Sequence, residues 1–510
     1  MQVGRQVLNW SLCVISAALL AACGGGGLDD SRLLKPDPLN PGGGSGGGST
    51  PAPGSAQVCA PNNPYRTDVA NHTVGSLSNE KNWVAQYMLD AYLWYKDIPA
   101  VNAGDAAYSN ENAVYSSLDA YFEALKTPLK TASGAKKDKF SFTYPTKKWD
   151  ELFASGASFS YGAEWKFSSV NSTTQKVQIA YVEPGSPAAA AGLMRGDTLV
   201  SVDGVSATDK AVNTQLEALL YPTVASKHTF TYTRNGNPAQ NADVTPGKVT
   251  SSPVLYKSTF TDGSDKVGYL VFNDHIATAE KQLIDTITDF KAQNVNTLIL
   301  DVRYNGGGYL YIASELAYMI AGATTSSNKV FEKLQYNDKR PTDTANGVTP
   351  FYSESCILVN GNCTKTAALP TLNLNKVYVI TSGSTCSASE AIINGLRGID
   401  VTVEVIGGTT CGKPYGFIGK SNCGISYFPM EFQGVNHKGD GVNPDGITPT
   451  CSASDDLTKA LGDQTEGMLK AALYRKNNPS SCLPSSAALG LGNSELRRSI
   501  IRENKYWIQR

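Results

Sequence analysis

A serine at a sharp turn between a strand and a helix is the first candidate for chemistry. The strand-like run 376–382 leads into Gly383 and several hydroxyl-bearing residues, and a helix is predicted over 388–397. A hydroxyl at this turn lies near the helix N-terminus, where unpaired N–H groups and the helix dipole favour developing negative charge. Ser387 or Ser389 could equally be an N-cap, a common role for serine at a helix start.

Two glycine-rich segments are the other candidates. The apolar run 298–302 leads to the glycine cluster Gly306–Gly308, before a helix predicted to begin near Tyr309. Glycine lets backbone N–H groups come close to a ligand, although a tight strand-to-helix turn would use the same residues. A phosphate loop is excluded because the Gly-Lys-Ser/Thr ending is absent. In the segment 406–416, Lys413 stands among Cys, Gly and Pro residues, which favours a fixed, partly enclosed loop.

Other kinds of site have weaker support. Ser-x-x-Lys patterns occur at scattered places, as chance would give, and the four histidines lie in no recognisable nucleophile context. The chain has no Cys-x-x-Cys or His-Glu-x-x-His pattern for zinc. A formal net charge of -1 offers no basic excess to nucleic-acid phosphates. We therefore expect no cofactor, no metal and no nucleic-acid partner.

Three folded regions must position the candidate residues. Aromatic residues at helical spacing between about 75 and 150 predict helices that pack into a core. The next region, to about 250, predicts strands and a hairpin turn at Asp203-Gly204. From about 265 to 475, strands and helices alternate, which is typical of an α/β layer architecture. The predicted strands are 177–182, 198–202, 267–272, 297–302, 376–382 and 401–406, with a helix face at Leu283, Ile287 and Phe290.

Together these segments resemble the carboxy-terminal processing, or tail-specific, protease family. Asp301-Val302-Arg303 with its glycines matches one family motif, residues 384–390 match the nucleophile motif, and Gly412-Lys413 matches the lysine motif. Residues 185–203 match a PDZ signature. The resemblance covers about residues 75–475. It implies a multidomain α+β and α/β protein with an N-terminal helical segment, a PDZ-like β-rich domain and a crotonase-like α/β catalytic core.

The resemblance also implies a Ser–Lys dyad. Ser387 would attack the scissile carbonyl, and Lys413 would take the serine proton and later give it to the leaving amine. The backbone N–H groups of Ala388 and Gly307 would form the oxyanion hole, where each donor contributes about 3–4 kcal/mol to the transition state.

A lysine that acts as a base must be neutral. A free lysine has a pKa of about 10.4, so burial or positive neighbours must lower the pKa of Lys413 to roughly 7–8. An apolar, dry site is therefore predicted, with Tyr415 and Phe417 as candidates to line it. The family carries a Gln four residues after the lysine, where this chain has Phe417, so the group that orients Lys413 is not identified.

Cys386 and Cys411 each stand one or two residues from a dyad member. We predict a disulfide between them that ties the nucleophile turn to the lysine loop.

The PDZ resemblance places a peptide-binding loop at 159–163. PDZ domains bind a peptide C-terminus by strand addition, and a backbone nest receives the carboxylate. Tyr161, Gly162 and Ala163 are the expected substrate-binding residues. A PDZ-shaped spacer without binding is the alternative.

The N-terminus indicates export. Arg5 precedes the apolar run 12–20, which is too short to span a bilayer comfortably. The sequence 20–23 resembles a bacterial lipoprotein cleavage box in which Cys23 is acylated, with an ordinary secretory signal as the alternative. Apart from Cys13 and Cys23 the chain has eight cysteines, and export makes disulfides the expected state. Cys356 and Cys363 are a candidate local pair.

The predicted function is that of a serine endopeptidase acting on exported polypeptides. The PDZ-like domain would read a substrate C-terminus or unfolded segment, and a lipid on Cys23 would anchor the protein to the outer membrane, facing the periplasm. A catalytically inactive peptide-binding lipoprotein is the alternative, and a small-molecule or lipid carrier is a third reading. The predicted domains are a lipoprotein signal peptide at 1–23, a Gly/Pro/Ser-rich tether at 24–58, an N-terminal helical domain at 59–156, the PDZ-like domain at 157–250, the α/β serine protease core at 251–480 and a C-terminal tail at 481–510 without an assigned role.

Overall fold

The computed structural model describes residues 54–355, 357–359, 362–484 and 494–497. The predicted signal peptide, Cys23 and most of the tether lie outside the described residues, as does Cys356 of the candidate local pair. The chain divides into two compact units, Met1–Pro41 and Gly42–Arg510, and every described residue belongs to the second. Among the described residues, no helix is both long enough and apolar enough to cross a membrane.

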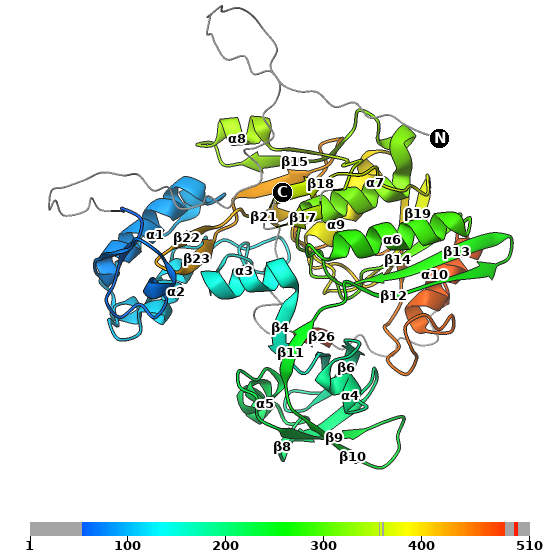
Figure 1. Ribbon diagram of the computed structural model, residues 1–510, viewed down its shortest axis with the longest axis horizontal. Helices are drawn as coiled ribbons and strands as arrows, with labels where there is room; N and C mark the ends of the chain where they lie inside the picture. Colours follow the sequence, from blue (N-terminus) through cyan, green and yellow to red (C-terminus); the bar gives the residue numbers. More distant parts are fainter. Residues whose placement is uncertain (1–53, 356, 360–361, 485–493, 498–510) are drawn as a thin grey trace, which may run out of the picture. The chain divides into compact units, whose positions relative to one another are not determined.

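A six-stranded sheet forms the centre of the region predicted as the catalytic core (Figure 1). Its order is β12-β13-β14-β19-β20-β25, and all neighbours are parallel except β12 with β13. The central strands are buried on both faces, which is typical of a parallel sheet covered by helices. The strands are β12 (Val254–Asp262), β13 (Asp265–Phe272), β14 (Thr297–Asp301), β19 (Lys376–Thr381), β20 (Thr402–Gly407) and β25 (Cys451–Ser452).

Helices cover both faces of this sheet. Three of them pack against one set of strand residues that includes Leu300 and Val379. A fourth helix packs against the alternate set, which includes Ile299 and Ile380. Successive strand residues point to opposite faces, so the two clusters lie on opposite sides of the sheet. The predicted strands and helix face of this region are confirmed to within two residues. The helices are α6 (Ala279–Ala292), α7 (Leu310–Ser326) and α9 (Ala388–Gly398) on the first side and α10 (Gly467–Asn477) on the second.

The three candidate segments leave the sheet at the same end. The glycine cluster follows β14, the Ser387 turn follows β19, and the Lys413 loop follows β20. These strands are adjacent and parallel, with Asp301 beside Ile380. The carboxyl ends of neighbouring parallel strands lie side by side, so the topology brings the segments together. Ligand sites of open α/β sheets usually lie at this end.

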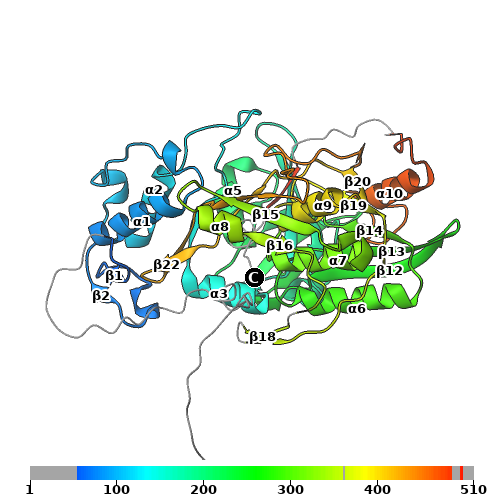
Figure 2. The same ribbon diagram turned by 90° about the horizontal axis from the view of Figure 1, so that it is seen from above.

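The N-terminal helical region shares its core with residues that follow the lysine loop. α1 (Leu77–Ala91) and α2 (Val114–Ala124) pack with aromatic residues of β23 (Ile425–Phe428). Figures 1 and 2 show α1 and α2 near the strand β22 (Lys420–Asn422), which precedes β23 in the chain. β3 (Phe142–Pro145) pairs with β23 in a sheet of order β22-β23-β3. A disulfide joins Cys59 to Cys423 across 364 positions of the sequence. The helices were predicted, but the shared sheet was not.

A second large sheet forms most of the region predicted as PDZ-like. Its order is β10-β9-β7-β6-β5-β26, with β8 paired to β7. The turn between β7 and β8 carries Asp203 and Gly204 at φ values of 48° and 79°, so the predicted hairpin is confirmed. β26 comes from the predicted C-terminal tail and was not predicted. The strands are β5 (Ala163–Ser169), β6 (Gln175–Val182), β7 (Thr198–Val202), β8 (Val205–Ser206), β9 (His228–Thr233), β10 (Gln240–Val244) and β26 (Ser494–Arg497).

A four-stranded sheet of order β16-β15-β24-β21 supports the lysine loop, because β21 (Tyr415–Gly416) begins two residues after Lys413. Its other strands are β15 (Val330–Tyr336), β16 (Val348–Pro350) and β24 (Phe432–Val435). The two-stranded pairs are β1 (Val58–Cys59) with β2 (Thr73–Val74), β4 (Ala157–Ser160) with β11 (Gly247–Thr250), and β17 (Ile357–Val359) with β18 (Asn362–Lys365). The remaining α-helices are α3 (Thr146–Ser155), α4 (Pro187–Ala190), α5 (Asn213–Leu220) and α8 (Pro341–Asn346).

Candidate active site

Ser387 stands at the N-cap of α9 in an unusual backbone conformation. Its φ and ψ are 58° and −117°, a region that residues other than glycine rarely adopt. The side chain is fully buried. Ser387 and Glu390 occupy the positions of a capping box, but Ser387 Oγ makes no hydrogen bond of ordinary geometry to any described residue. A serine that only caps a helix would use this oxygen to accept a first-turn N–H. A serine held in strain between a strand and a helix is typical of a nucleophile turn.

Gly307 packs directly against this turn. A Cβ atom added to Gly307 would lie 2.8 Å from Ser387 Cβ and 2.9 Å from the carbonyl oxygen of Cys386. The φ of Gly307, 98°, also disfavours any side chain there. Glycine is therefore required at this position for the backbone to approach Ser387 closely.

The N–H group of Gly307 already has an acceptor. It donates to Asn305 Oδ1 at 2.9 Å, so in this structure it is not free to meet an oxyanion as the sequence analysis expected. Asn305 is itself held, because its Nδ2 donates to the carbonyl of Phe272 at 2.9 Å. Ala388 differs from Gly307 in this respect. It is the first residue of α9, so the helix itself supplies no acceptor for its N–H.

Lys413 lies in a buried, aromatic site. Its side chain is fully buried, and Nζ lies 5.2 Å from the ring centroid of Phe417 and 5.5 Å from that of Phe140. Burial lowers the pKa of Lys413 well below its ordinary value, and the charges of Glu390 and Asp138 oppose that shift only in part. The predicted apolar environment and the role of Phe417 in lining it are confirmed. Among the described contacts, Tyr415 instead packs on Trp94, with ring centroids 4.7 Å apart.

Glu390 connects the serine turn to the lysine loop. It is fully buried one turn into α9. Its Oε2 accepts the backbone N–H groups of Ser387 and Lys413, each at 2.9 Å. Its Oε1 accepts the N–H of Gly412 at 3.0 Å and the hydroxyl of Thr410 at 2.5 Å. Burial raises the pKa of Glu390, whereas these four donors favour the ionised form and oppose the rise.

A disulfide makes the same connection covalently. Cys386 and Cys411 are bonded, with their Cα atoms 5.2 Å apart. The backbone N–H of Cys411 also donates to the carbonyl of Thr385 at 3.0 Å. The predicted pairing is therefore confirmed, and the lysine loop is fixed against the serine turn by a covalent bond and by hydrogen bonds.

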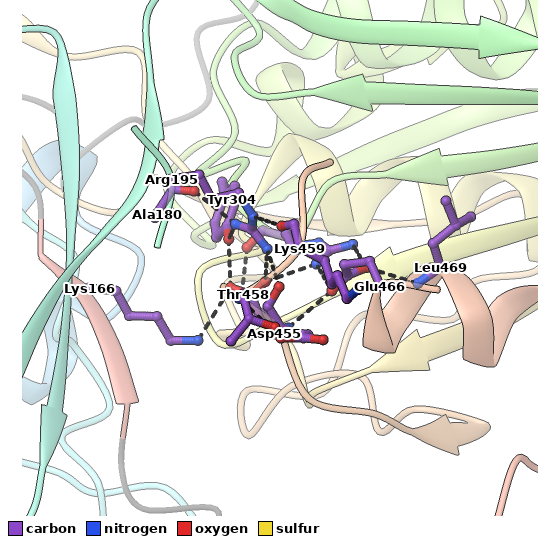
Figure 3. Close-up of polar contacts among 12 residues, drawn as sticks. Lys166, Ala180, Arg195, Tyr304, Asp455, Thr458, Lys459, Glu466 and Leu469 are labelled. Carbon is purple, nitrogen blue, oxygen red and sulfur yellow. Dashed lines mark hydrogen bonds and ion pairs between the residues drawn. The ribbon is translucent and has the colours of Figure 1, made fainter. Parts of the chain in front are cut away.

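A buried polar network surrounds Asp455 (Figure 3), and it includes Arg303 and Tyr304, which directly precede the glycine cluster in the chain. The Arg303 guanidinium is fully buried and donates to Asp301, Asp455 and Glu466. Burial alone would raise the pKa of Asp455, but the positive charges of Arg195, Arg303 and Lys166 outweigh it and hold this pKa well below its usual range. A buried cation with three carboxylate partners is compensated, so the strand end before the glycine cluster is rigidly held.

The same network reaches the PDZ-like sheet. Tyr304 Oη donates to Asp455 Oδ2 at 2.5 Å and accepts from Arg195 at 2.5 Å. Arg195 also donates to Asp455 Oδ1 at 2.6 Å, and Lys166 of β5 donates to Oδ2 at 3.2 Å (Figure 3). Residues 166 and 195 belong to the PDZ-like region, whereas 304 and 455 belong to the core. The segment that carries the glycine cluster is therefore hydrogen-bonded to the PDZ-like sheet.

The predicted peptide-binding loop precedes β5. Tyr161 is buried and its Oη donates to the carbonyl of Leu219 at 2.9 Å, so its side chain belongs to the core of the sheet. Gly162 has a φ of 79°, and a Cβ there would lie 2.2 Å from Ser186 Cβ. Its N–H donates to Ser160 Oγ at 3.2 Å. Ala163 begins β5 and pairs with Val182 of β6.

Sequence reasoning missed several residues that shape this site. Glu390 was recognised only as the end of the nucleophile motif, although its place three residues after a candidate N-cap serine is a known helix-start signal. Phe140 and Asp138 come from the N-terminal region, far from Lys413 in the sequence, and no local pattern indicates that contact. Asn305 carried no signal apart from its position beside the glycines.

Comparisons with known proteins agree with these segments. Residues 266–418 match the model of peptidase family S41, residues 79–142 match the peptidase S41 N-terminal domain, and residues 178–228 match a PDZ domain. The chain is 25% identical over 148 residues to a carboxyl-terminal-processing protease of Picosynechococcus sp., a match that covers 29% of this chain and 36% of the relative. It is 23% identical over 191 residues to a carboxyl-terminal-processing protease of Synechocystis sp., covering 38% and 44%. These matches span less than half of the length of either relative.

A solved structure covers much more of the chain. A protein of Bacteroides fragilis NCTC 9343, assigned to the S41 proteases, aligns with a TM-score of 0.59 and 25% identity. The alignment covers 78% of this chain and 97% of that one. The likeness therefore extends over the N-terminal, PDZ-like and core regions together.

Proposed function

We propose that this chain, a member of peptidase family S41 with a PDZ domain, is a serine endopeptidase that cleaves exported polypeptides with the dyad Ser387 and Lys413. The observation that carries the proposal is the state of Lys413. Its amine is fully buried among aromatic rings, with a pKa well below the ordinary value, on a loop bound to the Ser387 turn. A lysine with a lowered pKa, on a loop fixed against a strained serine turn, fits what a Ser–Lys mechanism requires.

The proposed reaction proceeds in two stages. Ser387 Oγ attacks the scissile carbonyl carbon while the neutral Lys413 Nζ takes the hydroxyl proton. The protonated lysine then gives this proton to the leaving amine, and the acyl-enzyme remains on Ser387. In the second stage, Lys413 takes a proton from water, the resulting nucleophile attacks the ester, and the proton returns to Ser387.

The proposed oxyanion hole uses the N–H groups of Ala388 and Gly307. The position of Ala388 at the start of α9 supports its role, because the helix dipole also favours negative charge there. Gly307 would have to exchange its bond to Asn305 Oδ1 for a bond to the oxyanion.

The proposed substrates are polypeptides whose C-terminus or unfolded segment is read at the 159–163 loop of the PDZ-like sheet. The turn at Gly162 and the adjacent strand β5 support this role. Export and lipid attachment through Cys23 to the outer membrane, facing the periplasm, belong to the same proposal and rest on the N-terminal sequence. A non-catalytic peptide-binding lipoprotein is the rival, and the buried amine of Lys413 argues against it.

Cleavage of an unfolded protein such as casein tests the proposal. The fragment lacking residues 1–58 would be compared with its Ser387→Ala and Lys413→Ala variants, with circular dichroism to check folding. Loss of cleavage in both folded variants supports the dyad, and unchanged cleavage in either one removes that residue from the mechanism. If the unsubstituted fragment does not cleave casein, an active-site-directed phosphonate decides: failure to label Ser387 would favour the peptide-binding rival.

A further inference from the structure

The free edge of the PDZ-like sheet is occupied by the chain itself. β5 pairs with β6 on one side and with β26 on the other, so β26 is the last strand of the sheet. β26 comes from residues 494–497, near the end of the chain, and Figure 1 shows it beside the strands of this sheet. Without β26, the backbone groups of β5 on this side would be an unpaired sheet edge.

The direction of β26 is that of a bound peptide. It runs antiparallel to β5, with Ser494 beside Ser168 and Arg497 beside Trp165. The strand therefore points toward the start of β5 and toward the loop at 159–163. A peptide that adds to β5 with its carboxylate at that loop would run in the same direction along the same edge.

One side chain of β26 makes a defined contact. Leu496 packs against the small cluster of Ala180, Tyr181 and Tyr304. Tyr304 belongs to the segment that leads to Gly307, and its hydroxyl bonds to Asp455 and Arg195. The strand therefore touches both the peptide edge of β5 and the chain segment that runs into the glycine cluster.

The connection to the rest of the chain keeps β26 close to this edge. Cys482 is bonded to Cys451 of β25, so the chain is fixed to the core twelve positions before β26 begins at Ser494. A segment tethered at short range meets its site at an effective concentration on the order of 1 mM. An external peptide of similar intrinsic affinity must compete with that concentration.

We propose that β26 is an internal ligand of the PDZ-like sheet, and that a substrate segment must displace it from β5. This inference rests on the proposed function in one respect, namely that β5 is the edge that reads the substrate. It assigns a role to the C-terminal tail: access of polypeptides to β5 is limited by the chain's own strand.

Two truncations test the proposal. Both carry Ser387→Ala to prevent cleavage. One ends at Pro484 and lacks β26 but keeps Cys482, and the other ends at Arg497 and keeps β26. The probe is a fluorescein-labelled extended decapeptide with an apolar C-terminal residue and a free carboxylate, followed by fluorescence anisotropy. The chain ending at Pro484 should bind the probe at least about tenfold more tightly than the full chain, because the edge is no longer occupied. The chain ending at Arg497 should bind like the full chain.

A point substitution checks the same idea without shortening the chain. Leu496→Asp should tighten probe binding in the full chain, whereas Val200→Asp, at an exposed position of β7, should leave it unchanged. Hydrogen exchange should show faster exchange of β5 amides in the Leu496→Asp variant.

The outcomes separate the two claims. Equal affinity of the full chain and the chain ending at Pro484 overturns the role of β26 and leaves the proposed protease intact. Failure of the probe to bind any chain, although casein is cleaved, overturns both the role of β26 and the reading of substrates by β5. Loss of casein cleavage with retained, β26-dependent probe binding would overturn the protease and leave this inference standing.

Discussion

The backbone N–H groups of Ser387 and Lys413 donate to the same oxygen, Oε2 of Glu390, at 2.9 Å each. One buried carboxylate thus fixes the distance between the turn that carries the serine and the loop that carries the lysine. Two further donors on the other oxygen come from the lysine loop. Glu390 is therefore a positioning residue that acts on the backbone of both segments.

Replacing Glu390 with Gln should reduce activity without unfolding the protein. A carboxamide has one acceptor oxygen, so two of the four donors lose their partner, at about 1–3 kcal/mol for each unsatisfied group. The loss of the negative charge also lowers the pKa of Lys413 further, since that charge now raises it. We expect kcat to fall by roughly 10–100-fold, about 1.4–2.7 kcal/mol in barrier, and the rise of kcat with pH to move to lower pH.

A pH profile of kcat on a peptide substrate measures both effects. Glu404→Gln is a matched control, because Glu404 lies on β20 and pairs with Arg475 away from the dyad. An unchanged profile in the Glu390→Gln variant would contradict the positioning role.

Lys413→Met should abolish the proposed peptidase activity and stabilise the protein at neutral pH. The pKa of Lys413 is lowered in the folded state from an unfolded value of about 10.4. At a pH below the folded-state pKa, the whole difference between the two pKa values counts against the folded state. This loss of folding stability becomes smaller as the pH rises toward the unfolded value of about 10.4. The variant removes the cost, so its Tm should exceed that of the parent at pH 7 by about 2–4 °C per kcal/mol gained.

Thermal unfolding at pH 7 and at pH 10 checks this prediction. The difference between the two proteins should shrink at the higher pH. A Tm difference that is the same at pH 7 and at pH 10 would mean that the buried amine of Lys413 does not cause the gain in stability.

Removing the Cys386–Cys411 disulfide should abolish activity. Its cost in folding stability should be no larger than that of removing the Cys451–Cys482 disulfide, which closes a loop of similar length. The double substitution to Ser opens a loop of 25 positions, and the Cys451–Cys482 pair closes a loop of 31 positions. Each loss should cost about 3 kcal/mol on the loop-entropy model. Only the first should lower kcat strongly, since only that pair ties the serine turn to the lysine loop. Equal kcat losses in both double variants, measured below their unfolding temperatures, would argue against a specific role.

Phe140→Leu should move the pH dependence of activity to higher pH. Phe140 forms one wall of the lysine site, and a smaller side chain admits water, which returns the pKa of Lys413 toward its ordinary value. Activity at neutral pH should fall and recover in alkaline buffer, with a stability cost of about 1–3 kcal/mol for the lost buried volume. Phe122→Leu, in the same core cluster on α2, is the control, and it should change stability but leave the profile in place.

The elements that could be predicted are those that have a pattern of their own in the local sequence. β13, β14, β19 and β20 are continuous apolar runs, and their carboxyl ends had to meet once the strands were parallel neighbours. The Cys386–Cys411 pair was predictable because both cysteines stand beside residues that the mechanism must hold together. Phe417 was predictable for the same reason, being four residues from Lys413.

The rest depends on contacts between segments that are distant in the sequence. β3 and β23 pair across the boundary predicted between domains, because aromatic residues of both segments share one core. The four residues of β26 form a strand only because β5 offers an edge. The hydrogen bond from Gly307 N–H to Asn305 Oδ1 depends on the orientation of one peptide group, which residue types do not specify.

The disulfide between Cys59 and Cys423 turns most of the folded chain into a covalent ring. If the proposed activity holds, copies of this protein can cleave one another, and a single cut anywhere between these two cysteines would open the ring without releasing a fragment. The nicked protein would keep its full mass on a non-reducing gel and separate into pieces only after reduction. Helices α1 and α2 would also remain joined to the residues that follow the lysine loop, so damage to the backbone need not mean loss of the active site.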